Sequence, residues 1–304
     1  MTDRTPMTWT QKLAAWFRGG FVPEPLGALE WFFIRLSFAA LVLWTMNDPH
    51  PFDFVGQPAP VGIARWMDIS WLHRDGMFQI VLATTAVLCL LYVVGRGLIV
   101  VLPLLTFVHV AVWTYSDSQG ATHHGLQLVS MVLLAQTLTV FFKWRSAPEV
   151  LRANLWYYSR GMVLFSYCAS ALTKTIDTRG LWVWRSKYFP IELVKSWRME
   201  YLDKFDPAYA GDPTAAFWLQ QHPFVAQIVF GSGFFLELFA FLGLRDRAWS
   251  ALIGILIVLM HFSIGWLMLL EFENHQWLAL IFLINIPGWI LLSRKNENAL
   301  PATV

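Results

Sequence analysis

The sequence predicts an all-α, polytopic integral membrane bundle, and three observations lead to this fold class. Of the 304 residues, 57% are hydrophobic and only 14% are charged, whereas about a quarter of the residues of a typical soluble domain are charged. The mean hydropathy is +0.50. Finally, about eight apolar segments approach the roughly 20 residues that a helix needs to cross a bilayer. In order, they cover residues 26–46, 77–94, 97–115, 126–142, 155–173, 224–243, 250–270 and 276–292.

The region before the first apolar segment has the pattern of a helix that lies in the membrane interface. Within residues 8–19, one helix face carries Trp9, Leu13, Trp16 and Phe17, and the basic residues lie elsewhere. We therefore expect three regions. They are an N-terminal interfacial segment (1–25), the transmembrane bundle (26–292) and a cytoplasmic tail (293–304).

Lysine and arginine are distributed unevenly between alternate loops. They occur in the N-terminal segment, after the second, fourth and sixth apolar segments and at the C-terminus, whereas 116–125 and 271–275 contain none. Because these residues concentrate in short cytoplasmic loops, we expect both termini in the cytoplasm and the chain in a cell inner membrane. The long segment 174–223 then faces outward. Its stretch 181–197 mixes aromatic and basic residues, which predicts an amphipathic helix over the outer ends of the bundle.

Composition also excludes some functions. A net charge of +2, spread over the loops, does not indicate nucleic-acid binding. The two cysteines, Cys89 and Cys168, lie in apolar segments and form no CxxC motif, so neither a disulfide framework nor thiol redox chemistry is indicated.

A polar stripe runs along the fifth apolar segment. Arg160, Tyr167 and Lys174 are spaced seven apart, which places them on one helix face about two turns from each other. An ionisable stripe is costly in lipid unless it faces the protein interior or a cavity. Lys174, at the end of this helix, is the candidate catalytic base, activated by desolvation. The alternative is a lysine that extends from a helix end to the headgroups.

Histidines supply the other candidates. At the start of the fourth apolar segment, His123 begins a stripe that continues through Gln127, Ser130 and Thr137, while His124 points about 100° away. A histidine pair at a helix entrance is also typical of a solvated cap. His261 lies near the middle of the seventh segment, where a histidine needs a partner. Two interpretations therefore remain: His261 contacts a ligand, or it is a core histidine whose hydrogen bonds are satisfied within the protein.

Four charged residues also lie within apolar segments: Glu30, Arg35, Arg160 and Glu237. We expect them to pair with each other and hold the bundle together, and Arg35 and Glu237 lie at similar depth. Arg160, near the cytoplasmic end, is expected to be structural. The spacing of the histidines and acidic residues matches no metal-ligand pattern, so no metal site is predicted.

Five stretches, taken in order, resemble a known family. They read FFIRLSF, THHGLQLVSMVL, LWYYSRGMVLFSYCASALTK, GFFLELFAFLGL and MHFSIGW. Over roughly residues 28–290, the chain is similar to the horizontally transferred transmembrane domain family, whose best-known member is the vitamin K-dependent gamma-glutamyl carboxylase.

The resemblance implies a reduced, menaquinone-like quinone bound within the membrane and a site open to the non-cytoplasmic side. In the carboxylase, the lysine that matches Lys174 deprotonates the hydroquinone. The histidines near the quinone match His124 and His261, and we add His123 and Tyr167 as candidate quinone contacts. Two differences from the carboxylase limit how far its function can be transferred to this chain. TIDTRGLW follows Lys174 where the carboxylase has paired lysines before an Asp-rich turn, and the large lumenal substrate-binding domain has no counterpart.

Three hypotheses follow. The first is a carboxylase-like membrane enzyme that uses a reduced quinone, with oxygen and carbon dioxide as further reactants and a protein or peptide as substrate. The second is a non-catalytic membrane subunit, or a quinone- or lipid-binding module, of a larger complex. The third and weakest is a proton-coupled transporter, since the sequence shows no inverted repeat or pair of broken helices.

Overall fold

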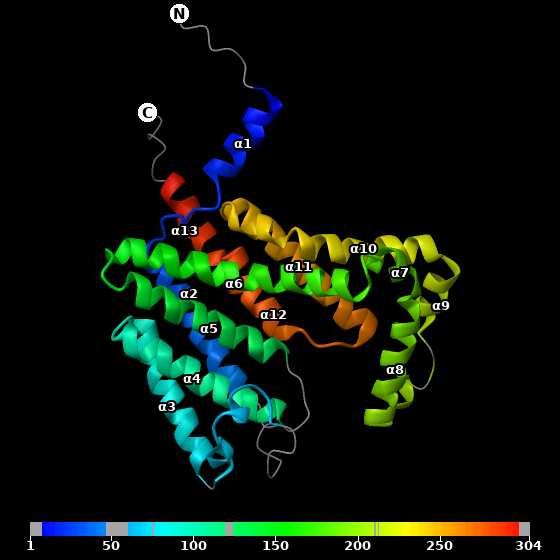
Figure 1. The fold of residues 1–304 in the computed structure, drawn as a ribbon, viewed down its shortest axis with the longest axis horizontal. Coiled ribbons are helices and arrows are strands. Elements are labelled where there is room, and N and C mark those ends of the chain that lie inside the picture. The colour runs from blue at the N-terminus through cyan, green and yellow to red at the C-terminus, as the bar shows by residue number, and fades with distance from the viewer. Residues whose placement is uncertain are drawn as a thin grey trace, which may run out of the picture.

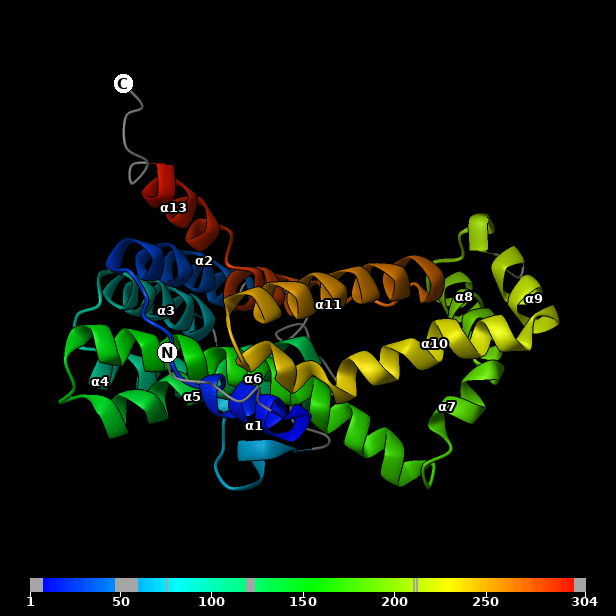
Figure 2. The ribbon, with the colours of Figure 1, turned by 90° about the horizontal axis from the view of Figure 1, so that it is seen from above.

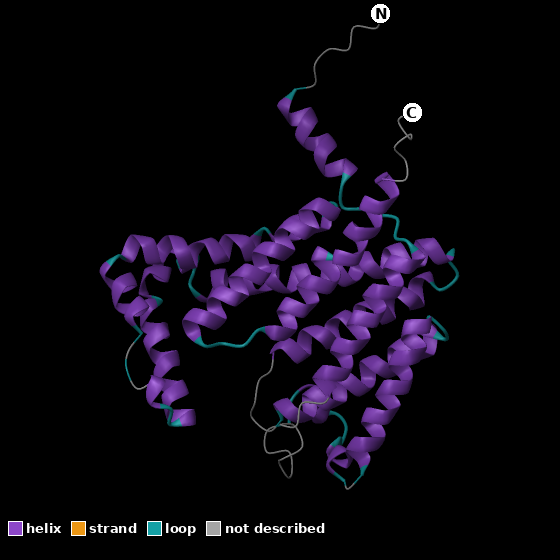
Figure 3. Ribbon diagram, turned by 180° about the vertical axis from the view of Figure 1, so that it is seen from behind, coloured by secondary structure: helices purple, strands orange, loops and turns teal. Residues whose placement is uncertain are grey.

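The computed structural model describes residues 8–46, 60–74, 76–118, 124–209, 211 and 213–297, and all regular structure in these ranges is helical. Figure 1 shows the path of the chain, and Figure 3 shows helices joined by loops, without a strand in the described part. The all-α prediction is confirmed for these residues.

The longer helices follow the apolar segments closely. Their bounds are α1 (Trp9–Gly19), α2 (Ala28–Met46), α3 (Met77–Val94), α4 (Leu98–Asp117), α5 (His124–Lys143), α6 (Pro148–Asp177), α7 (Trp182–Arg185), α8 (Pro190–Lys204), α9 (Thr214–Gln221), α10 (Pro223–Leu238), α11 (Arg247–Met268), α12 (Glu273–Leu278) and α13 (Ile286–Glu297). A π-helix (Ala279–Ile284) joins α12 to the residue before α13, and short 3₁₀ turns cover 62–65, 70–73, 186–188, 207–209 and 240–244.

Five of these helices, α2, α3, α4, α5 and α11, are long and apolar enough to cross a membrane. The chain is therefore a helical membrane protein. The other three predicted spans differ from a plain apolar helix. α6 is 30 residues long but carries a polar stripe. α10 has 16 residues and continues into the 3₁₀ turn 240–244, and the last segment is broken between the π-helix and α13.

Local sequence explains where several helices begin and end. Gly95 and Gly97 adopt left-handed backbone conformations, with φ of +81° and +63°, between α3 and α4. Glycine reaches this region without steric cost, so a tight turn joins α3 to α4, which pack against each other. Proline begins α6, α8 and α10, where its missing N–H costs no helical hydrogen bond. Asp246 caps α11 by accepting from the backbone N–H of Trp249 at 2.9 Å.

The helices form one bundle with a separate group at one end. α5 packs between α4 and α6, α2 lies beside α3, and α11 packs on the π-helix and on the 240–244 turn. Figure 2 shows that α7, α8 and α9 lie beyond the ends of α6, α10 and α11, on the side opposite the α3–α4 hairpin. The predicted outer segment is therefore helical and packs against α10 and α11. α1 is also present as a helix, although the side chains of Leu13 and Phe17 lie outside the described residues.

The break in the last apolar segment is stabilised by a buried polar cluster. Asn285 is fully buried with φ of +50°, and its side-chain amide donates to Glu30 Oε1 at 2.6 Å. Arg247, at the start of α11, pairs with the same oxygen at 2.7 Å. We call Glu30, Arg247 and Asn285 the helix-break cluster. It connects α2, α11 and the turn before α13, which are far apart in the sequence.

Two other charges in apolar helices find different partners from those predicted. The expected Arg35–Glu237 pair is wrong: Arg35 Nη1 donates to the carbonyl of Tyr92 at 3.0 Å, and Glu237 pairs with Lys174. Helical periodicity indicates depth and face but not which helices are neighbours, and α2 packs on α3, not on α10. Arg160 is fully buried and pairs with Glu24 at 3.6 Å, not with another of the four charges, and its guanidinium carbon lies 3.9 Å from the Trp156 ring centroid.

The predicted stripe on α5 does face the bundle. Gln127 donates to Asp117 at 2.9 Å, and Thr137 and Thr106 hydroxyls lie 2.8 Å apart. Between them, Ser130 Oγ lies 2.6 Å from His109 Nδ1, a residue that the sequence analysis missed.

Hydrogen bonding assigns the tautomer of His109. Thr45 donates its hydroxyl proton to the Val42 carbonyl, so its oxygen must accept from His109 Nε2 at 3.0 Å. Nδ1 is then the acceptor from Ser130, and the neutral ring links α2, α4 and α5.

The helix-break cluster leads to a prediction at Gly288. A Cβ atom there would lie 2.3 Å from Glu30 Oε1 and 2.5 Å from Arg247 Nη1, so Gly288→Ala must displace the ion pair. We expect a loss of about 1–3 kcal/mol, measured as a lower unfolding temperature in detergent. Gly19→Ala is the control, because nothing lies within 4 Å of its Cβ position. Equal unfolding temperatures for the two variants would contradict the stabilising role of the cluster.

Candidate functional site

The candidate catalytic lysine forms an ion pair with Glu237. Lys174 lies in the last turn of α6, and its Nζ donates to Glu237 Oε1 at 2.6 Å and Oε2 at 2.5 Å. Ser170, one turn earlier, donates to Glu237 Oε2 at 3.4 Å. The Lys174 side chain is 27% exposed and that of Glu237 10% exposed. The pair is therefore mostly buried, with Lys174 partly exposed on one side.

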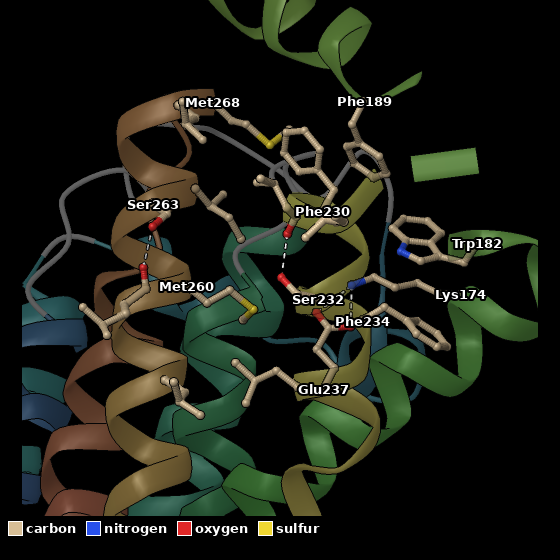
Figure 4. A pocket seen from close by; sticks show the side chains of 18 residues that line it. Lys174, Trp182, Phe189, Phe230, Ser232, Phe234, Glu237, Met260, Ser263 and Met268 are labelled. Atoms are coloured by element: carbon tan, nitrogen blue, oxygen red, sulfur yellow. Dashed lines mark hydrogen bonds and ion pairs between the residues drawn. The ribbon is translucent and has the colours of Figure 1, made fainter. Parts of the chain in front are cut away.

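That side is an apolar groove between α10 and α11. Its cavity volume is about 620 Å³. Figure 4 shows Lys174 reaching from α6 toward Glu237, with Trp182 and Phe189 beside it and Met260 and Ser263 opposite. Lys174 and Glu237 are the charged members of the lining, and aliphatic, aromatic and methionine side chains supply most of the rest. Lys174 Nζ also lies 5.1 Å from the Trp182 ring centroid. We call this space the α10–α11 groove.

Tyr167 and His261, the two other described candidates, meet in a separate buried cluster. Tyr167 Oη lies 2.8 Å from His261 Nε2, which connects α6 to α11. The His261 ring stacks on Phe272 at 4.6 Å between centroids and lies 5.3 Å from the ring of His275. His261 Nδ1 is buried without a hydrogen-bond partner in the described part of the chain. Neither His261 nor Tyr167 lines the α10–α11 groove.

The histidine pair cannot be placed in the same way. His123 lies outside the described residues, as does the side chain of His124, at whose backbone α5 begins. The next residue, Gly125, lies against Asn274, because a Cβ there would be 2.8 Å from the Asn274 amide nitrogen. The start of α5 therefore lies beside α12, near the end of the bundle that holds His275.

The sequence analysis missed three neighbours of the candidate residues. They are Glu237 and Trp182 beside Lys174, and His275 beside His261. Glu237 was identified as a buried charge but with the wrong partner. Trp182 was noted only as part of the aromatic outer segment, although it begins α7 and reaches Lys174. His275 closely follows Glu271 and Glu273 in the sequence, but this pattern alone does not indicate that it lies beside His261.

Among the described residues, no three His, Cys, Asp or Glu side chains are placed to hold a metal ion. Cys89 and Cys168 are both free thiols.

No family model, curated protein or solved structure matches this chain. The site must therefore be interpreted from its own geometry.

The chemistry available at the pair is proton exchange with an amphipathic ligand. Lys174 Nζ lies within hydrogen-bond distance of both Glu237 carboxylate oxygens, so the candidate base is part of an ion pair. Glu237 is then the group that can accept a proton, and Lys174 is the group that can stabilise a negative charge on a bound ligand.

The Tyr167–His261 hydrogen bond leads to a stability prediction. Tyr167→Phe keeps the ring but leaves His261 Nε2 unpaired in a buried position, which should cost about 1–3 kcal/mol. Thermal unfolding in detergent measures this loss. Tyr158→Phe, on the same helix and 46% exposed, is the control and should leave the unfolding temperature unchanged. If Tyr167→Phe is as stable as Tyr158→Phe, the hydrogen bond does not hold α6 to α11.

Proposed function

We propose that this protein is a membrane enzyme that takes a reduced quinone from the bilayer into the α10–α11 groove and accepts a proton from it at the Lys174–Glu237 pair. The observation that most directly supports this function is the position of the ion pair, which is the charged part of an otherwise largely apolar groove. The resemblance of the sequence to the carboxylase family agrees with this function, with oxygen, carbon dioxide and a protein or peptide substrate as further reactants.

The lining fits a menaquinone-like molecule. Such a ligand has a flat ring with two oxygen atoms and a long apolar tail. Aromatic side chains of Trp182, Phe189 and Phe230 would contact the ring and tail, and Ser232 and Ser263 add hydroxyl groups to the lining. The bound quinone would supply the redox chemistry.

The residues of this chain then have distinct roles. Glu237 accepts the hydroxyl proton of the ligand, and Lys174 moves its hydrogen bonds to the ligand oxygen and stabilises its charge. Lys174 thus acts with Glu237 and not alone. Tyr167 and His261 are adjacent and would orient α6 and α11 around the pair, while a contact of His123 or His124 with the ligand stays a prediction.

We also propose the finer topology that the charge distribution predicts: eight crossings, both termini in the cytoplasm and an inner-membrane location. α6, the α10 helix with its 3₁₀ turn, and the broken α12–α13 segment would complete the five apolar helices. In this arrangement α1 and α8 lie in the two interfaces, and the ion pair lies in the half of the bundle nearer to the outside.

A charge swap tests the function. Lys174→Glu combined with Glu237→Lys keeps an ion pair between α6 and α10 but reverses the groups presented to a ligand. We expect near wild-type unfolding temperature and loss of most of the menaquinone that co-purifies with, or is added back to, the wild type. The control swap is Lys195→Glu with Glu192→Lys, an exposed pair on α8 that is 3.4 Å apart.

A second variant separates the groove from the charges. Gly233→Leu fills the α10–α11 groove, of which Gly233 is a lining residue, without altering the pair, and it should also reduce quinone retention. Full retention in both the charge swap and Gly233→Leu would contradict the proposal. The alternative function, a non-catalytic subunit held together by the pair, would then be favoured.

Cysteine labelling in intact cells tests the topology. In a background with Cys89 and Cys168 replaced by alanine, Glu271→Cys should react with a membrane-impermeant maleimide. Glu149→Cys should react only after the membrane is permeabilised, because it lies at the start of α6 on the other side. Both positions are exposed in the structure. The reverse pattern, or equal labelling, would refute the orientation.

A further inference from the structure

A second groove lies between α2 and the broken C-terminal segment, away from the Lys174–Glu237 pair. Its cavity volume is about 770 Å³. One wall is a face of α2 that runs from Phe33 to Trp44, and the other runs from Glu273 at the start of α12 to Pro287 in α13. We call it the α2–α12 groove.

The backbone of the second wall is irregular where it lines the groove. Leu280 and Ile281 belong to the π-helix, and Ile286 and Pro287 follow the left-handed residue Asn285. At membrane depth, a non-helical backbone is tolerated where it is buried or lines a cavity, and π-helices are frequent at functional sites. The helix-break cluster holds this irregularity in place from the buried side, so the groove is a built feature of the fold.

The two ends of the groove differ in polarity. Ile34, Leu41, Leu280 and other apolar side chains line most of its length. Glu273 and Gln276 lie at the end where α12 begins, and no described residue of the lining carries a positive charge.

Two tryptophans mark the depth of the polar end. Trp44 and Trp277 line the same end and are 47% and 48% exposed. Tryptophan concentrates at the headgroup level of membranes, so this end of the groove lies at the interface.

The length of the groove matches one leaflet. From Phe33 to Trp44, α2 rises about 16 Å at 1.5 Å per residue. Half of a typical hydrocarbon core is about 15 Å thick. An acyl chain of a phospholipid whose headgroup lies beside Glu273 would therefore extend along the apolar wall to Pro287.

We propose that the α2–α12 groove binds a phospholipid with a primary-amine headgroup, of the phosphatidylethanolamine type. The exposed Glu273 carboxylate and the Gln276 amide oxygen accept hydrogen bonds from the ammonium group. An anionic headgroup would meet the Glu273 carboxylate without a lining cation to offset it, and a choline headgroup has no N–H to donate. This site is independent of the proposed quinone chemistry.

Native mass spectrometry of the delipidated full-length protein tests the site with phosphatidylethanolamine, phosphatidylcholine and phosphatidylglycerol that share the same acyl chains. We expect the ethanolamine lipid to be retained about threefold more than the other two. A partly exposed ion pair contributes a preference of this magnitude. Glu273→Gln should remove this preference. Glu271→Gln, the same change at an exposed residue outside the groove, should keep it.

A steric variant tests the groove itself. Ala40→Phe places a ring on the α2 wall and should lower the retention of all three lipids, while the quinone content of protein purified without delipidation stays unchanged. Equal retention of the three lipids by the wild type would overturn the proposal. So would a preference that survives Glu273→Gln, or one that is lost in Glu271→Gln.

Discussion

The need to neutralise charge within apolar helices is the constraint on which this structure depends. A charged side chain in the hydrocarbon region is stable only with a partner, and breaking a buried pair costs about 3–5 kcal/mol. Glu30 on α2 meets Arg247 on α11, and Lys174 on α6 meets Glu237 on α10. Each pair joins segments that are distant in the sequence. Hydrophobic burial contributes little to helix choice in lipid, so these polar contacts select which helices become neighbours.

The two pairs differ in access, and this difference separates structure from chemistry. Glu30 and Arg247 have side chains only 7% and 12% exposed, and the buried Asn285 donates to the same carboxylate oxygen that Arg247 contacts. Such a pair has no free face for a ligand. Lys174 is 27% exposed and faces the α10–α11 groove, so a ligand can enter and exchange hydrogen bonds with it. The Glu30–Arg247 pair therefore holds helices together at one end of the bundle, whereas the Lys174–Glu237 pair near the other end is the candidate reactive pair.

The sequence predicted those features that depend on local pattern. Apolar length located the five helices that are long and apolar enough to cross a membrane, and the stripe through Ser130 located the face of α5 that packs inward. Partner choice could not be predicted in this way, because Arg35 and Glu237 have similar depth but lie on helices that do not pack together. His109 was missed for the same reason, since its value depends on hydroxyls from two other helices.

The broken helix left a trace in the sequence that hydropathy alone conceals. Asn285 is followed by Ile286-Pro287, and proline fits the first turn of a new helix but not the interior of a continuous one. Asparagine also tolerates the left-handed conformation. The apolar run continues across these residues, so a window average treats them as one span.

The separation of the charge pair from the histidine cluster constrains any mechanism. The Lys174–Glu237 pair faces the α10–α11 groove, whereas His261 contacts Tyr167, Phe272 and His275 in the interior and does not line that groove. A ligand in the groove would therefore touch Lys174 without touching His261 in this arrangement. His261 is connected to the proposed proton exchange by its hydrogen bond to Tyr167, whose helix also carries Lys174 two turns later. In the proposed function His261 would then act as a positioning residue, because it bonds Tyr167 without lining the groove.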